Sequence, residues 1–105
     1  MKHIINGKRY DTQAPLTKEI ASWSNGFGVS DFRGCTETLY RTGRGAFFLY
    51  GKGGPMTRWS RSYGTMHTDG SGIMPLSRQE AQAWCETHHQ NEALETYFPE
   101  YIEDA

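Results

Sequence analysis

Two segments in the middle of the chain have the pattern of a β-hairpin. Residues 36–41 (Thr-Glu-Thr-Leu-Tyr-Arg) and 46–50 (Ala-Phe-Phe-Leu-Tyr) are rich in β-branched and aromatic residues, which favour strands. Two glycines between them, Gly43 and Gly45, suit a tight connection. The pattern therefore predicts two antiparallel strands joined by a short turn.

The first third of the chain predicts a second hairpin and a loop. Residues 2–12 contain Asn6-Gly7, the dipeptide preferred in two-residue type I′ turns, between two short apolar and polar segments. Residues 16–24 match both helical and alternating spacing, and we favour a strand. Residues 24–34 contain three glycines and a further Asn-Gly step, so we expect a loop.

The last third of the chain has the clearest helix signal. Ser77 and Glu80 form a capping-box pattern, in which each side chain bonds the backbone N–H of the other residue. Residues at helical spacing follow and predict one buried stripe: Ala81, Trp84, Cys85 and His88. We expect a helix over 77–89, with Trp84 packed against a sheet, and a second short helical turn before Pro99.

The segment between the central hairpin and the helix is rich in glycine. Residues 51–72 hold six of the twelve glycines and predict a long, irregular, polar loop that Trp59, Tyr63 and Met56 could dock onto the body. With the other elements, this predicts an α+β fold. We expect an antiparallel sheet of four to five strands with a C-terminal helix packed on one face.

Composition limits the class of protein. The 105 residues fit a single domain, 1–105, and the three Trp, six Tyr and five Phe must supply much of its core. No apolar run approaches the roughly 20 residues of a membrane span, and no apolar leader follows Met1. With two cysteines, a disulfide-dense scaffold is excluded. We therefore expect a soluble, cytoplasmic protein with no membrane partner.

Charge is divided unevenly along the chain. Residues 33–61 contain six cations and one acid, Glu37, whereas residues 78–105 contain Arg78 and seven acids. One interpretation gives the protein a basic face for phosphates or an acidic protein, and an acidic face for a second partner. The other interpretation is that the two segments neutralise each other within the fold.

Three candidate chemistries are weak. A zinc site could be drawn from a scattered set of residues: Cys35, His67, Asp69, Cys85 and His88. A strong zinc signal has two close ligand pairs, and here only Cys85 and His88 are close. Neither cysteine has a flanking catalytic signature. Residues 51–55 (Gly-Lys-Gly-Gly-Pro) lack the ending of a P-loop. We expect no metal, no cofactor and no enzymatic activity.

Cations and aromatic residues alternate through the middle of the chain. This mixture is typical of nucleic-acid grooves and of protein-interface hot spots, although it also fits an aromatic core with solvated arginines. Our candidate partner-binding residues are Arg41, Arg44, Lys52, Arg58, Trp59, Arg61 and Tyr63. The acidic alternative for the contact surface consists of Glu92, Glu95, Glu100, Glu103 and Asp104.

Several segments resemble a family of small, poorly characterised accessory proteins from phages and mobile elements of Gram-positive bacteria. They are residues 5–12 (Ile-Asn-Gly-Lys-Arg-Tyr-Asp-Thr), 37–41, 48–56 and 75–77. The resemblance brings no catalytic residues and implies an inhibitor of a host defence system, of the anti-CRISPR type. We expect a non-enzymatic inhibitor that binds a host defence protein, a Cas effector first. The alternative is a nucleic-acid-binding accessory protein using the basic aromatic segment 33–63, although bare nucleic acid should bind weakly.

Overall fold

A four-stranded antiparallel sheet forms the body of the protein. The computed structural model describes residues 1–28 and 30–105. The strands of the main sheet, in spatial order, are β3 (Lys18–Ser24), β4 (Cys35–Arg41), β5 (Phe47–Gly53) and β8 (Gly70–Leu76). The central hairpin β4–β5 and the strand β3 were predicted from the sequence, and both are confirmed.

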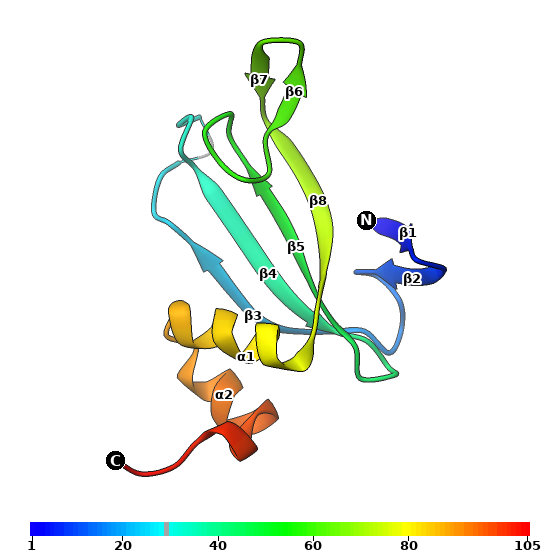
Figure 1. Cartoon of the computed structure of the whole chain (residues 1–105), viewed down its shortest axis with the longest axis vertical. Helices are drawn as coiled ribbons and strands as arrows, with labels where there is room; N and C mark the ends of the chain where they lie inside the picture. The colour runs from blue at the N-terminus through cyan, green and yellow to red at the C-terminus, as the bar shows by residue number, and fades with distance from the viewer. Residues whose placement is uncertain (29) are drawn as a thin grey trace.

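Two small hairpins accompany the main sheet (Figure 1). The first consists of β1 (Lys2–Ile5) and β2 (Lys8–Asp11), and the second of β6 (Arg61–Tyr63) and β7 (Met66–Thr68). Asn6 and Gly7 join β1 to β2 with φ angles of 52° and 76°, the positive values that a type I′ turn requires. The first hairpin was therefore predicted correctly, but it forms a sheet of its own.

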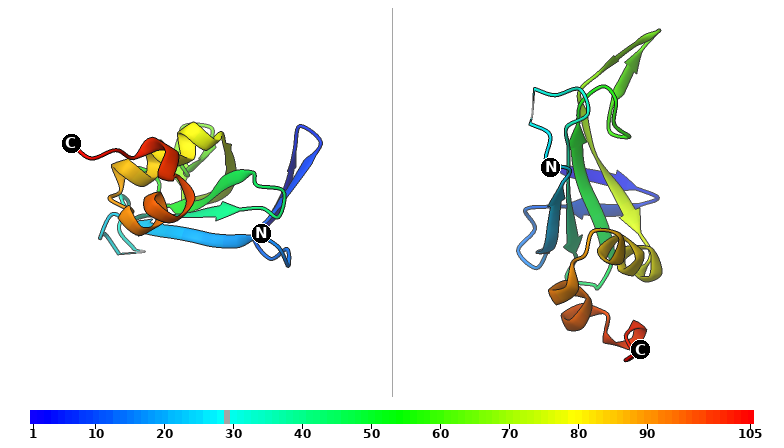
Figure 2. Two further views of the ribbon diagram at one scale, coloured as in Figure 1. Left: turned by 90° about the horizontal axis from the view of Figure 1, so that it is seen from below. Right: turned by 90° about the vertical axis from the view of Figure 1, so that its left-hand side faces the viewer.

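Helices cover one face of the main sheet at one end (Figure 2). They are α1 (Arg78–Thr87), α2 (Asn91–Tyr97) and a 3₁₀ turn, η1 (Pro99–Tyr101). The predicted capping box is present: Ser77 Oγ accepts from the Glu80 N–H at 3.1 Å, and Glu80 Oε1 accepts from the Ser77 N–H at 2.8 Å. The α+β fold is thus confirmed, with a second helix that is longer than the predicted turn.

The core lies between the sheet and the helices. Its fully buried side chains include Leu39 and Leu49 from the sheet, and Cys85 and Phe98 from the helical part. Trp84 is buried between α1 and the sheet, as predicted. On the opposite face, Phe48 is covered by the rings of Tyr10 and Tyr40, at centroid distances of 5.6 and 5.2 Å.

The predicted long loop over residues 51–72 is wrong. Residues 51–53 complete β5, residues 61–68 form the β6–β7 hairpin, and β8 begins at Gly70. Glycine is needed in these strands because Trp59 lies directly on them. A Cβ on Gly51 would be 1.9 Å from Cε2 of Trp59, and one on Gly70 would be 1.9 Å from the Trp59 carbonyl oxygen. The remaining loop, residues 54–60, folds over the sheet.

The main sheet has two distinct ends (Figure 1). The helix end contains the β4–β5 turn and the helices. Arg41 and Phe47 are paired on either side of the turn, and Phe47 is paired with Leu76, which directly precedes the start of α1. The loop end contains residues 25–34 and 54–60 and the β6–β7 hairpin. No helix in the described part of the chain is long and apolar enough to cross a membrane.

Candidate functional site

A buried carboxylate, Glu37, lies at the centre of the helix-covered face. Side chains alternate along a strand, so Glu37 and Leu39 of β4 both point toward the helices. Glu37 is only 3% exposed, and among the residues that the structure describes it is the only charged one that is buried. A buried carboxylate is costly unless its oxygens receive hydrogen bonds, so its partners decide its role.

Three donors from two other elements surround the Glu37 carboxylate. Trp84 Nε1 of α1 donates to Oε1 at 2.8 Å, and Trp59 Nε1 of the 54–60 loop donates to Oε2 at 2.8 Å. The Arg58 guanidinium contacts Oε2 through Nε and Nη2, each at 2.7 Å. One carboxylate therefore ties the 54–60 loop and α1 to the central strand.

These donors keep Glu37 ionised. Burial alone would raise the pKa of Glu37, but the hydrogen bonds from Trp84, Trp59 and Arg58, with the charge of Arg58, lower the pKa below its ordinary value. Both carboxylate oxygens therefore act as hydrogen-bond acceptors between β4, the 54–60 loop and α1.

His88 completes this cluster one turn after Trp84. Its ring packs between Trp23 of β3 and Trp84, at centroid distances of 4.1 and 4.8 Å, and its Nε2 lies 3.9 Å from Glu37 Oε1. Burial lowers the pKa of His88, and this effect exceeds the opposing attraction of Glu37. His88 is therefore a neutral, packed imidazole near pH 7.

The two cysteines are poor nucleophiles. Burial raises the pKa of Cys85 to about 11, and burial and the charge of Glu37 raise the pKa of Cys35. Both thiols are free. Within residues 1–28 and 30–105, no three His, Cys, Asp or Glu side chains are grouped to bind a metal.

The predicted partner-binding residues separate into two groups. Arg41 and Arg44 lie at the helix end, exposed on β4 and on the β4–β5 turn. The others lie at the loop end: Lys52, Arg58, Trp59, Arg61 and Tyr63. Trp59 is 8% exposed and packs on the sheet, so it supports the site from beneath. Arg58 is half-exposed while it contacts Glu37.

The loop end exposes five large apolar side chains, and four of them are more than 60% exposed. Phe32, Met56, Tyr63 and Met66 are 66, 70, 62 and 66% exposed, respectively. The loops of Phe32 and Met56 are joined, because the Met56 N–H donates to the Phe32 carbonyl at 2.9 Å. Tyr63 and Met66 are direct partners across the β6–β7 hairpin. We call the following six residues the loop-end surface: Phe32, Arg33, Met56, Arg58, Tyr63 and Met66.

Sequence reasoning found two of these six residues, Arg58 and Tyr63. Phe32 was placed in a loop without a role, Met56 was expected to dock its loop onto the body but is 70% exposed, and Met66 was not singled out. Their position on glycine-flanked turns was the available signal, because an apolar residue in an exposed turn has little core to enter. Which loops meet at one end depends on the strand order, which the sequence pattern does not specify.

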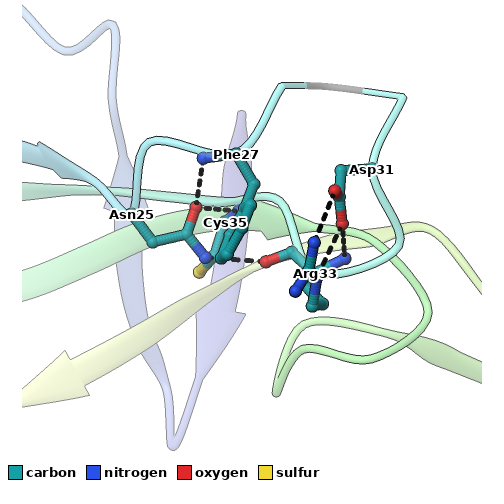
Figure 3. Close-up of polar contacts among 5 residues, drawn as sticks. All are labelled: Asn25, Phe27, Asp31, Arg33 and Cys35. Atoms are coloured by element: carbon teal, nitrogen blue, oxygen red, sulfur yellow. Dashed lines mark hydrogen bonds and ion pairs between the residues drawn. The ribbon is translucent and has the colours of Figure 1, made fainter.

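Side-chain hydrogen bonds hold the loop that presents Arg33 (Figure 3). Asn25 Nδ2 donates to the Arg33 carbonyl at 2.7 Å, and Asn25 Oδ1 accepts from the Phe27 and Cys35 N–H groups at 3.2 Å. Asp31 accepts from the Arg33 backbone at 2.7 Å and from its guanidinium at 3.1 Å. The guanidinium lies 4.0 Å from the centre of the Phe27 ring. Arg33 is thus held in place before any partner binds.

Comparisons with protein-family models, curated proteins and solved structures found no match to this chain.

Proposed function

We propose that the chain is a non-enzymatic binding protein that contacts another protein through its loop-end surface. The observation that supports this most strongly is the exposure of Phe32, Met56, Tyr63 and Met66 at one end of a small domain. Fully burying such a side chain contributes about 1.5 to 3 kcal/mol, so covering them against a partner would be favourable.

The composition of the surface fits a protein partner. Aromatic residues, methionine and arginine are enriched at protein interfaces, whereas lysine and acidic residues are depleted. The six residues of the loop-end surface are of the enriched types, and the exposed cations Lys52 and Arg61 lie at the same end. Hot spots also use arginine beside aromatic residues, as Arg33 and Arg58 are placed here.

The support beneath the surface also favours binding. Asn25 and Asp31 hold the loop of Arg33, and Glu37 holds Arg58 and, through Trp59, the 54–60 loop. A surface that is already ordered loses less conformational entropy when a partner binds. The indole N–H groups of Trp59 and Trp84 occupy both oxygens of Glu37, which supports a non-enzymatic role for this cluster.

The candidate partner comes from the sequence resemblance alone. Accessory proteins of phages and mobile elements suggest a host nucleic-acid-targeting defence complex as the partner, with a Cas effector first. The proposed activity is inhibition of that complex by direct protein–protein contact.

A protection assay with matched variants tests this proposal. Tyr63→Ser/Met66→Ser removes two exposed apolar side chains from the loop-end surface, and Ile4→Ser/Ile102→Ser removes two from other parts of the molecule that are 67 and 46% exposed. Both variants should melt like the wild type, because exposed residues contribute little to stability. We expect the wild type and the Ile4/Ile102 variant to protect a phage or plasmid against one defence system of a panel.

The Tyr63/Met66 variant should lose that protection. Equal protection by both variants would reject the loop-end surface as the contact. Failure of the wild type against every system of the panel would reject inhibition of those systems.

A further inference from the structure

Most of the unpaired positive charge lies on the β1–β2 hairpin and at the helix end of the sheet. Of the eleven lysines and arginines, three form ion pairs in the described structure: Arg33 with Asp31, Arg58 with Glu37, and Arg78 with Glu100. Two of the remaining eight, Lys52 and Arg61, lie at the loop end. The other six form what we call the basic platform: Lys2, Lys8, Arg9, Lys18, Arg41 and Arg44.

The basic platform is assembled from segments that lie together in space. The β1–β2 hairpin, the segment 12–17 and the β4–β5 turn lie on the same side of the sheet (Figure 1). Leu16 packs on the turn so closely that a Cβ on Gly43 would be 2.7 Å from the Leu16 Cβ. Tyr10 holds the hairpin by packing on Phe48. Three adjoining segments therefore carry the six cations, with Lys18 and Arg41 paired in the sheet and Lys8 and Arg9 on opposite faces of the hairpin.

One pair of these cations lowers the stability of the sheet. Lys18 of β3 and Arg41 of β4 are direct partners in the sheet register. Like charges directly opposite each other in a sheet are destabilising. The same segments contain only two carboxylates, Asp11 and Glu19, and one oxygen of Asp11 already accepts from the Gln13 N–H at 2.9 Å. The acidic C-terminal segment does not neutralise them either, since its one ion pair in the described residues is with Arg78.

We propose that the basic platform binds the phosphate backbone of nucleic acid. Phosphate contacts need cations and no aromatic hot spot, and half of the platform consists of lysine, which protein-interface cores disfavour. The loop-end surface has the opposite character, so the two surfaces suit different partners. The contact would be independent of sequence and weaker than about 1 μM near physiological salt, as is typical of non-specific binding. This inference goes beyond the proposed function, and it does not depend on it.

Salt-dependent binding to a labelled DNA duplex tests the inference. Each phosphate contact on duplex DNA adds about −0.9 to the slope of log K against log salt. The variant Arg41→Gln/Arg44→Gln should therefore reduce the size of the slope by about 1.8 between about 50 and 200 mM salt. The matched variant Lys52→Gln/Arg61→Gln also removes two exposed, unpaired cations of the described chain and should leave the slope unchanged.

Three results would overturn the inference. They are the absence of duplex binding at about 50 mM salt, equal effects of the two variants, and binding of a poly-glutamate peptide as tightly as a duplex of equal charge. The last result would identify an acidic protein as the partner. The variant Tyr63→Ser/Met66→Ser should bind the duplex like the wild type, so failure of the loop-end proposal can be recognised separately.

Discussion

Replacement of Glu37 by glutamine tests how the fold is held together. The variant keeps the size of the side chain but removes its charge and replaces one acceptor oxygen by an NH₂ donor. The single oxygen of glutamine can accept from Trp59 or from Trp84. The other indole N–H then faces the glutamine NH₂ group, which is also a donor, and loses its hydrogen bond. Leaving a buried N–H donor without its acceptor costs about 1 to 3 kcal/mol. Small domains have total stabilities of about 5 to 15 kcal/mol, so this loss is large.

Urea unfolding followed by tryptophan fluorescence measures the effect. The control is Arg58→Ala, which removes the half-exposed partner and leaves both indole hydrogen bonds. Because solvent screens that pair, we expect the control to lose about 1 kcal/mol or less. A loss below about 1 kcal/mol for Glu37→Gln would refute the reasoning. Equal losses in the two variants would also refute it.

The same variant should change how stability depends on pH. The pKa of Glu37 is lowered in the folded protein, so the unfolded chain binds the proton more tightly. The stabilisation by Glu37 is therefore complete above the unfolded pKa, about 4.5, and is lost as the pH falls through the lower folded value. The Glu37→Gln variant should lose less stability over this range than the wild type does.

Three further predictions concern the core. Trp84→Ala should cost about 3 to 5 kcal/mol in urea unfolding because it leaves a cavity and removes a donor to Glu37; a Tm within a degree or two of the wild type would contradict this. Gly51→Ala should cost about 1 to 3 kcal/mol, because the new Cβ would overlap the Trp59 ring; unchanged stability would mean that Trp59 does not lie on β5. In a Cys35→Ser variant, Cys85 should react with a thiol reagent at pH 8 only after unfolding, because burial raises its pKa to about 11; rapid reaction of the folded protein would contradict its burial.

Local patterns predicted the elements whose signals are local. The Asn6-Gly7 turn and the Ser77–Glu80 capping box both depend on residues close in sequence, and both are present. The strand β8 was missed because Gly70 and Gly72 are poor strand formers by themselves. Gly70 is required there because a Cβ would lie 1.9 Å from the carbonyl oxygen of Trp59, a residue about ten positions earlier. A tertiary contact thus overrides local preference.

The candidate site was predicted less completely for the same reason. Arg58 and Tyr63 follow from the mixture of cations and aromatic residues, but the burial of Trp59 follows from its contacts with Gly51 and Glu37. Alternation along β4 places Glu37 on the same face as Leu39, which was a usable signal for its burial. Its three donors come from positions 21 to 47 residues away, and no local pattern indicates them.

Hydrogen exchange of the chain in complex with an inhibited defence effector tests the central claim most directly. Backbone amides become protected where a partner covers them, so the footprint distinguishes the candidate surfaces without any substitution. We predict new protection over residues 30–34, 54–58 and 61–68, with exchange at residues 92–104 unchanged. Protection confined to the acidic residues 92–104, with the loop end exchanging as in the free protein, would contradict the assignment of the loop-end surface.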